Sequence, residues 1–346
     1  MPPLVSILIP AYNAERWIAD TIRSALAQTW PRKEIIIVDD GSRDRTLSGA
    51  QQFASRNVLV VSQPNQGASA ARNKAFELCQ GDYIQWLDAD DLLSSDKVAK
   101  QMVAAQQHQD KRTLLSSGWG YFMYRPSHAQ FLPTSLWCDL PPVDWLLRKL
   151  GQNLHMQTAT WLVSRELTLA AGLWDTRLSL DDDGEYFCRV VLASNAIRFV
   201  PDAKVFYRQQ SFDRLSSIDR SDKKLESQFL SMQLHVDYLR SLEESERARA
   251  AAVNYLQTWF LWFFEERPDL ALELERLAAT LGGRLEPPRL SWKYAWIEKL
   301  FGFAAAKRTR LYYNQSKSSA LRAWDKMLFF FDPRSGALPD RRACDG

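Results

Sequence analysis

The feature that most constrains the fold is a regular alternation of short apolar runs and amphipathic segments over the first hundred residues. Four runs are rich in β-branched and aromatic side chains, at residues 5–9, 34–38, 58–61 and 83–87. Helical periodicity occupies the segments around them, at residues 16–28, 46–56, 68–79 and 97–107. Strands that are apolar throughout are buried on both faces, which is typical of a parallel sheet covered by helices. The pattern therefore predicts an α/β fold with a mostly parallel sheet flanked by helices.

The rest of the chain has a different character. Further strands are expected at residues 114–124, 158–163, 196–200 and 204–207, and further helices at 165–171 and 184–193. Beyond about residue 211 the periodicity is helical, at residues 221–242, 246–265, 268–281 and, in a basic and aromatic segment, 291–330. We therefore predict an α/β domain over residues 1–212, with part of its sheet antiparallel, and a helical C-terminal extension over residues 213–346.

Cysteine usage and hydropathy exclude several classes of protein. The four cysteines are widely spaced and none belongs to a Cys-x-x-Cys pair, so we expect neither a zinc site nor a disulfide framework. The N-terminus resembles a strand more than a signal peptide, and no run approaches the roughly 20 apolar residues of a membrane-spanning helix. These features predict a cytoplasmic protein.

Acidic residues follow two of the predicted strands. Asp40 closes the second strand, and Asp88, Asp90 and Asp91 follow the fourth. In an open parallel sheet, ligands bind at the carboxyl ends of the strands. The first strand is not followed by Gly-x-Gly-x-x-Gly, and the chain has no Gly-x-x-x-x-Gly-Lys-Ser/Thr, so neither a dinucleotide-dependent dehydrogenase nor a P-loop protein is supported.

The Asp-x-Asp pattern of Asp88 and Asp90 suits a divalent cation. Two carboxylates one residue apart can reach one pocket, and Mg²⁺ or Mn²⁺ takes oxygen ligands, often one or two protein carboxylates plus phosphates. Such an ion would neutralise a departing diphosphate. The structural alternative is that Asp90 or Asp91 caps the helix expected to begin near Ser95.

Five motifs in order give the sequence a family resemblance. They are VSILIPAYNA at residues 5–14, SALAQTW at 24–30, EIIIVDDGSRDRT at 34–46, NQGASAARNKA at 65–75 and GDYIQWLDADD at 81–91. In this order and spacing they resemble the family 2 glycosyltransferases, and a weaker resemblance continues to about residue 210. The resemblance implies a GT-A type fold, with a nucleotide-sugar-binding half at residues 1–110 and an acceptor half at residues 111–212. It also implies inversion at the anomeric carbon of the sugar.

The resemblance also implies roles for individual residues. Pro10, Ala11 and Tyr12 would line the pocket of the nucleotide base. Asp40 would accept the imino proton of the base, and Arg72 would contact the base or a phosphate. Asp88 would bind the ribose and Asp90 the metal ion, Mn²⁺ or Mg²⁺.

The general base is assigned to Asp183 by the same resemblance. Inverting transfer needs one base to deprotonate the acceptor hydroxyl, and crowding among Asp181, Asp182 and Asp183 would raise at least one carboxyl pKa toward that task. The alternative is that the three acids only begin a helix, where they favour the helix dipole.

Two departures from the family pattern concern the site. The family usually has Glu-Asp where this chain has Asp182-Asp183, so either aspartate is a candidate base. It often has His where this chain has Gln210, which bears on any metal or phosphate contact from that loop.

The C-terminal segment at residues 284–331 holds ten basic residues against three acidic ones, a balance of +7, with aromatic residues interleaved. Segments of this kind lie on anionic membrane surfaces. The alternative is a helical subdomain packed on the core with solvated basic faces; nucleic-acid binding is a weaker third possibility.

These patterns together predict an inverting glycosyltransferase that moves a sugar from a nucleoside-diphosphate sugar, most simply a UDP-sugar, to a glycan or glycolipid. The expected setting is the inner face of the plasma membrane, in polysaccharide assembly. Two alternatives stay open: a nucleotidyltransferase, and a nucleotide-sugar-binding module without turnover.

Overall fold

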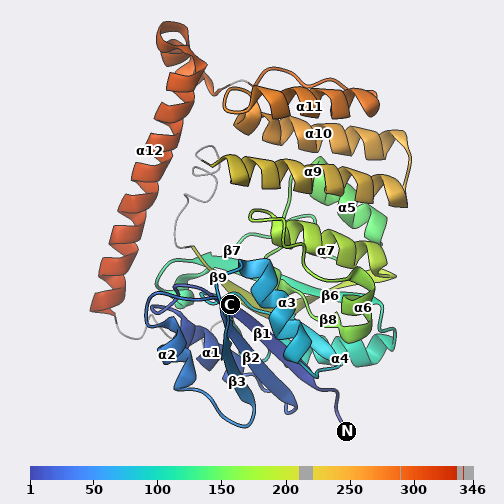
Figure 1. The fold of residues 1–346 in the computed structure, drawn as a ribbon, viewed down its shortest axis with the longest axis vertical. Coiled ribbons are helices and arrows are strands. Elements are labelled where there is room, and N and C mark those ends of the chain that lie inside the picture. The colour runs from blue at the N-terminus through green and yellow to red at the C-terminus, as the bar shows by residue number, and fades with distance from the viewer. Residues whose placement is uncertain (210–220, 289, 333–337, 339–346) are drawn as a thin grey trace.

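A computed structural model describes residues 1–209, 221–288, 290–332 and 338 (Figure 1). Its first sheet has the order β3-β2-β1-β4-β8, and the first four of these strands are parallel. The antiparallel edge strand β8 pairs with β4. The strand bounds are β1 Val5–Ala11, β2 Lys33–Asp39, β3 Val58–Ser62, β4 Tyr83–Trp86 and β8 Val163–Ser164. The predicted parallel sheet and its four strands are thus confirmed.

A second sheet of four strands lies beside the first, in the order β5-β9-β6-β7. Its strands are β5 Leu92–Leu93, β6 Thr113–Phe122, β7 Gln130–Phe131 and β9 Ala196–Arg208. The two short strands expected at 196–200 and 204–207 are one strand. The ladder with β6 shifts register between Ser117 and Gly118, opposite the step from Val200 to Lys204, so the residues between them bulge. Pro201 lies in this bulge and explains the interruption in the sequence pattern.

Helices cover both faces of the first sheet and continue beyond it (Figure 1). Those of the α/β part are α1 Ile18–Leu26, α2 Thr46–Gln51, α3 Ala68–Leu78, α4 Lys97–His108, α5 Pro142–Gly151, α6 Arg165–Ala171 and α7 Asp182–Ala193. The strand expected at 158–163 is wrong over residues 158–160 and is confirmed only at its end, where Leu162 bridges to Leu115 and β8 begins at Val163. Residues Thr158–Thr160 form a 3₁₀ turn, because the Gln157 side chain accepts a hydrogen bond from the Ala159 amide and caps it. Helix α5 was not expected from the sequence.

The helical extension is α9 Asp222–Leu242, α10 Glu246–Phe263, α11 Pro268–Thr280 and α12 Ala295–Phe331. Helices α9, α10 and α11 stack on the side of the molecule that carries α5 and α7 (Figure 1). Their buried residues, among them Val236 and Phe260, belong to the same hydrophobic core as Ile7 of β1. This part of the extension therefore shares the core of the α/β domain.

Helix α12 runs back along one side of the molecule toward the first sheet (Figure 1). Gly302 breaks it, with φ of 83°. Near its start Lys307 Nζ lies 2.8 Å from Glu266 Oε2, and near its end Asp325 Oδ1 lies 2.7 Å from Arg125 Nε. None of the helices that the structure describes is long and apolar enough to cross a membrane.

Candidate active site

The carboxyl ends of β1, β2 and β4 open into a cavity of about 530 Å³. Eight of the nine predicted site residues line it: Pro10, Ala11, Tyr12, Asp40, Arg72, Asp88, Asp90 and Asp182. Because parallel strands end at one edge of the sheet, motifs up to 80 residues apart meet there. The ninth, Asp183, lies just outside the lining, one residue further into α7.

Asp40 is buried and organises the loop that faces it. Its carboxylate accepts hydrogen bonds from the Gln63 side chain at 2.7 Å and the Asn65 side chain at 3.1 Å. It also accepts from the backbone amides of Gln66 at 3.0 Å and Gly67 at 2.8 Å. A carboxylate offers about four acceptor positions. A nucleotide base that reaches Asp40 must therefore share or displace one of these donors.

Two glycines keep the backbone of the site in place. Gly41 has φ of 71°, and a side chain there would bring its Cβ within 2.8 Å of the Asn65 amide nitrogen. Gly184 adjoins the Asp181 carboxylate so closely that any Cβ would collide with it. Gly41 needs the conformational freedom of glycine, and both positions need its small size.

Arg72 of α3 joins the two ends of the cavity. Its Nη1 lies 2.7 Å from Asp182 Oδ2, and its Nη2 lies 2.8 Å from Asp88 Oδ1. The arginine side chain is only 7% exposed. Burial alone would lower the pKa of this guanidinium, but Asp182 and Asp88 raise it above the ordinary value. Arg72 is therefore a fixed cation that holds two carboxylates at set positions.

Trp174 supports Arg72 and was not among the predicted site residues. The guanidinium carbon lies 4.3 Å from the centroid of the Trp174 ring, which in turn stacks on Tyr186 at 4.0 Å. The Asn73 side chain bonds both the amide and the carbonyl of Trp174, at 2.8 and 2.9 Å. The weaker motif Gly172-Leu-Trp-Asp was the signal that could have indicated it.

The acidic trio spans the start of α7. Asp181 precedes the helix with φ of 58° and accepts a 2.9 Å hydrogen bond from Ser231 Oγ of α9. Nearby His235 is fully buried, and burial together with Lys149 lowers its pKa to about 3, so its ring is neutral. The helical extension thus holds the backbone that leads into Asp182 and Asp183, the two candidate bases.

The two candidate bases differ in their surroundings. Burial raises the pKa of the Asp182 carboxyl, Arg72 opposes this effect, and Asp183 adds to it. Burial and the neighbouring Asp181 raise the pKa of the Asp183 carboxyl. Asp183 accepts hydrogen bonds from Thr158 Oγ1 at 3.2 Å and the Gly184 amide at 2.9 Å. Both are weaker partners than a guanidinium, so Asp183 is the better proton acceptor of the two.

The two neighbouring acids after β4 have different surroundings, because Asp90 faces the cavity and Asp91 faces the interior. Asp90 is 8% exposed and lines the cavity, and its backbone carbonyl accepts from Arg208 Nε at 2.9 Å. Asp91 is fully buried and accepts from the Gln157 side chain and the Arg208 amide. Asp91 therefore links the segment after β4 to β9. The capping role considered for Asp90 and Asp91 does not apply, because the N-cap of α4 is Asp96.

The residues at this edge fit a hard divalent cation. Asp88 and Asp90 both line the cavity with carboxylates, but no group of three or more His, Cys, Asp or Glu side chains placed for a metal occurs among the described residues. One or two carboxylates suffice for Mg²⁺ or Mn²⁺ when phosphate oxygens complete the shell. Gln210, the departure from the family pattern, lies outside the described residues.

The fold and this site define the chain as a GT-A type protein. Residues 6–126 match the family described as Glycosyl transferase family 2. The solved structure of residues 1–349 of S. aureus TarS in complex with UDP superposes with a TM-score of 0.59 at 17% identity, covering 95% of this chain and 92% of that one. Over residues 6–126 the chain is similar to the family 2 glycosyltransferases, and the superposition shows the GT-A type fold.

Two relatives from Bacillus subtilis illustrate how far the similarity extends. TuaG, named as a teichuronic acid biosynthesis glycosyltransferase, is 47% identical over 103 residues, which are 29% of this chain and 41% of TuaG. The uncharacterized glycosyltransferase EpsJ is 28% identical over 239 residues, which are 66% of this chain and 68% of EpsJ. The chain thus spans less than half of TuaG and about two thirds of EpsJ.

Proposed function

We propose that this protein transfers a sugar, with inversion, from a nucleoside-diphosphate sugar to a hydroxyl group of a glycan or glycolipid. One observation supports this above all: Arg72 links Asp88, at the nucleotide end of the cavity, to Asp182, at the start of the catalytic helix. The donor and the acceptor can therefore react within one cavity of about 530 Å³. TarS, whose structures include UDP and UDP-GlcNAc complexes, supports a uridine donor.

The donor would lie along the strand ends. Pro10, Ala11 and Tyr12 would line the base, and Asp40 would receive its imino proton in exchange for one donor of the 63–67 loop. Asp88 would bind the ribose. Arg72 would hold Asp88 and contact the base or a phosphate.

Asp90, with Asp88 beside it, would hold the metal ion against the diphosphate. When bound, Mn²⁺ or Mg²⁺ supplies positive charge that stabilises the departing nucleoside diphosphate. The protein's own contribution is to fix the two carboxylates, through Arg72 for Asp88 and through the Arg208 bond to the Asp90 backbone.

Asp183 would act as the general base, with Asp182 as the alternative. Its carboxylate would accept the proton of the acceptor hydroxyl as that oxygen bonds to the anomeric carbon and the diphosphate departs from the opposite face. The raised pKa of Asp183 brings it closer to the working pH of a base. Thr158 would orient the carboxylate.

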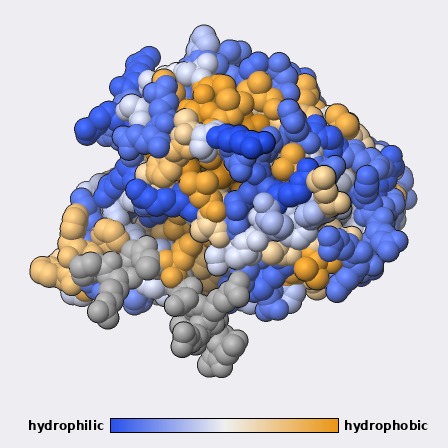
Figure 2. Space-filling model, turned by 90° about the horizontal axis from the view of Figure 1, so that it is seen from below, coloured by the Kyte–Doolittle hydropathy of each residue, from blue (hydrophilic) through white to orange (hydrophobic). Residues whose placement is uncertain are grey.

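The proposed setting is polysaccharide assembly at the inner face of the plasma membrane. Most large side chains of α12 and the turn before it are solvent-exposed, including Trp292 at 81% and Phe331 at 80%. A hydrophobic lobe stands at the left edge of the molecule seen from below, on the side where α12 ends in Figure 1 (Figure 2). Exposed aromatics among basic residues support docking on anionic lipid. Within residues 284–331, the contact of Phe303 with Phe264 supports the packed alternative for that part of the segment.

Product analysis tests the proposal. The protein is incubated with Mn²⁺, a panel of UDP-sugars and candidate glycan acceptors, and the nucleotide products are separated. We expect free UDP and an elongated acceptor of inverted anomeric configuration. Release of pyrophosphate would instead indicate a nucleotidyltransferase, and tight UDP-sugar binding without any product would indicate a binding module.

A further inference from the structure

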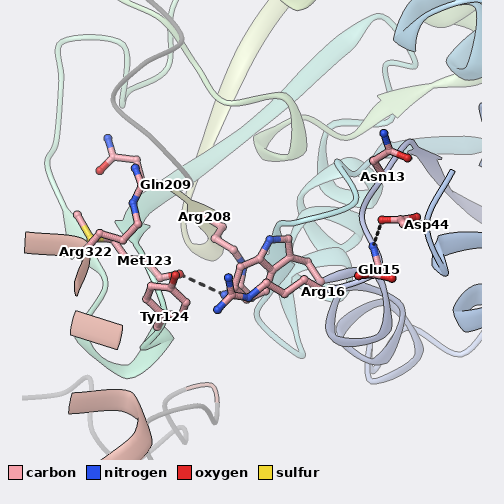
Figure 3. A pocket seen from close by; sticks show the side chains of 10 residues that line it. Asn13, Glu15, Arg16, Asp44, Met123, Tyr124, Arg208, Gln209 and Arg322 are labelled. Atoms are coloured by element: carbon pink, nitrogen blue, oxygen red, sulfur yellow. Dashed lines mark hydrogen bonds between the residues drawn. The ribbon is translucent and has the colours of Figure 1, made fainter. Parts of the chain in front are cut away.

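A second cavity, of about 360 Å³, is lined by the residues drawn in Figure 3. It shares Asn13 with the cavity of about 530 Å³ proposed for the donor, called the donor cavity below. The lining of the second cavity comes from the segment between β1 and α1, the β2–α2 loop, the residues just after β6, the end of β9 and α12. The ten residues are Asn13, Glu15, Arg16, Trp17, Asp44, Met123, Tyr124, Arg208, Gln209 and Arg322. Arg208 also connects them, because it lines the second cavity and donates to the backbone of Asp90 in the first.

Three arginines give this cavity spare hydrogen-bond donors. Arg16 lies over the rings of Trp17 and Tyr124, at 4.6 and 5.0 Å, and makes no hydrogen bond or ion pair within the described part of the chain. Arg322 Nε is buried and has no hydrogen-bond partner among the described residues. The third, Arg208, lies 4.0 Å from the Trp17 ring centroid. Aromatic faces hold these planar cations in place while their N–H groups stay available.

The two acids of the cavity are already engaged. Asp44 accepts hydrogen bonds from the Thr46 amide at 2.9 Å and from the Thr46 hydroxyl at 2.5 Å. It also accepts one from the Glu15 amide at 3.1 Å. Glu15 accepts from the Arg45 amide at 3.0 Å, and the Arg45 guanidinium lies 3.5 Å away. The polar groups of this cavity that still lack partners within the described chain are therefore mainly N–H donors of positively charged arginines. Such donors suit an anionic ligand.

Helix α12 is fixed where it contributes Arg322. Asp325, one turn further along, pairs with Arg125 and accepts from the Tyr124 amide at 2.9 Å. Phe329 lies 6.2 Å from the Tyr124 ring. These contacts add a cation of the C-terminal helix to a cavity that also contains Arg16 of the N-terminal half, so the lining is complete only when α12 is docked.

We propose that this second cavity binds an anionic group of the acceptor, a phosphate or a carboxylate, and so delivers the acceptor beside the donor cavity. This inference rests on the proposed transferase function. The acceptor is favoured over the donor because Asp88, Asp90 and Arg72 already provide for the donor's nucleotide and diphosphate in the first cavity. The site would make the protein selective for anionic glycans or for acceptors linked to a lipid phosphate.

Anion binding is tested first without turnover. The full chain, saturated with UDP and Mn²⁺, is titrated with β-glycerophosphate or glucuronate at constant ionic strength, and the melting temperature is followed, with glycerol and glucose as neutral controls. We expect saturable stabilisation by at least one of the two anions. Arg16→Gln should weaken the apparent affinity by roughly tenfold, because a charge-assisted hydrogen bond is lost. Arg322→Gln should act in the same direction.

Arg23→Gln is the matched control, because Arg23 lies in helix α1, which follows Arg16 directly, pairs with Asp20 and lines neither cavity. Stabilisation by neither anion, or equal affinities in Arg16→Gln and wild type, would overturn the inference while UDP binding continued to support the proposed function. Absence of UDP binding would count against the proposed function itself. Once acceptors are identified, Arg16→Gln should raise the KM for an anionic acceptor. The KM for the donor and the KM for a neutral acceptor should stay unchanged.

Discussion

Arg72 and Asp182 form a 2.7 Å ion pair between side chains 110 positions apart in the sequence. The same guanidinium holds Asp88 at 2.8 Å. Asp88, the proposed ribose ligand, and α7, which carries the proposed base, are therefore fixed relative to each other by one side chain. Changes at Arg72 should disturb donor binding and the approach of the base together.

Arg72→Lys tests this coupling. Lysine keeps the charge, but one ammonium cannot reproduce the planar fork that holds both carboxylates. We expect UDP affinity to fall about tenfold and the free energy of unfolding by about 1–3 kcal/mol, below the usual loss for a fully buried pair because both carboxylates are partly exposed. Calorimetric titration and denaturant unfolding measure the two effects. Arg23→Lys is the control, because Arg23 belongs to an exposed ion pair, and it should change the free energy of unfolding by less than about 0.5 kcal/mol. If Arg72→Lys changed UDP affinity and stability as little as this control does, the account would be contradicted.

Asp90→Asn tests the metal site. The neutral amide is a poor substitute for the anionic ligand, so Mn²⁺ should strengthen UDP binding in the wild type and not in the variant. UDP titration with and without Mn²⁺ is the measurement, and it needs no turnover. Asp20→Asn, an exposed change on α1, should behave as wild type. Metal-enhanced UDP binding that survives in Asp90→Asn would remove Asp90 from the metal site.

The exposed face of α12 should bind anionic vesicles. Each accessible Lys or Arg contributes about 1 kcal/mol near an anionic leaflet, and the attraction should weaken as salt approaches roughly 0.5 M. Replacing both Trp292 and Trp296 by Ser should reduce co-sedimentation, because both side chains are exposed. Leu169→Ser removes an equally exposed apolar side chain from α6 and should have no effect. Equal binding to neutral and anionic vesicles, or none to either, would contradict a membrane role.

The sequence predicted those parts of the fold that depend on local periodicity. The strands of the first sheet and helices α6, α9, α10 and α11 lie within a few residues of their expected positions. The turn at Thr158 and the bulge at Pro201 were missed, because a side-chain cap and a register shift between strands decide them. Both depend on tertiary contacts that periodicity does not contain.

The candidate site was predicted as a set of residues and not as an arrangement. Family motifs indicated Arg72 and Asp182 separately, but their ion pair follows only from how α3 and α7 pack. The support from Trp174 and the bracing of Asp181 by Ser231 likewise join segments far apart in the chain. The cavity containing Arg322 could not be foreseen, since it depends on α12 folding back onto β6.

The central claim is that Asp183 deprotonates the acceptor, and Asp183→Asn tests it most directly. The ionised carboxylate has a raised pKa in the folded state, so it destabilises the native protein at neutral pH, and its removal should raise the melting temperature at pH 7. That gain should disappear at acidic pH, where the wild-type carboxyl is protonated. Wild-type kcat should rise with pH through this raised pKa, because only the ionised form accepts a proton.

The decisive measurement is UDP release in the presence of acceptor, together with UDP-sugar affinity, for wild type, Asp183→Asn and Asp182→Asn. The account predicts that Asp183→Asn binds the donor as wild type does and releases UDP roughly 10²–10⁴-fold more slowly. Asp182→Asn should mainly weaken donor binding, since it loses the Arg72 pair. Wild-type turnover by Asp183→Asn, with the rate loss found in Asp182→Asn instead, would contradict the account and assign the base to Asp182.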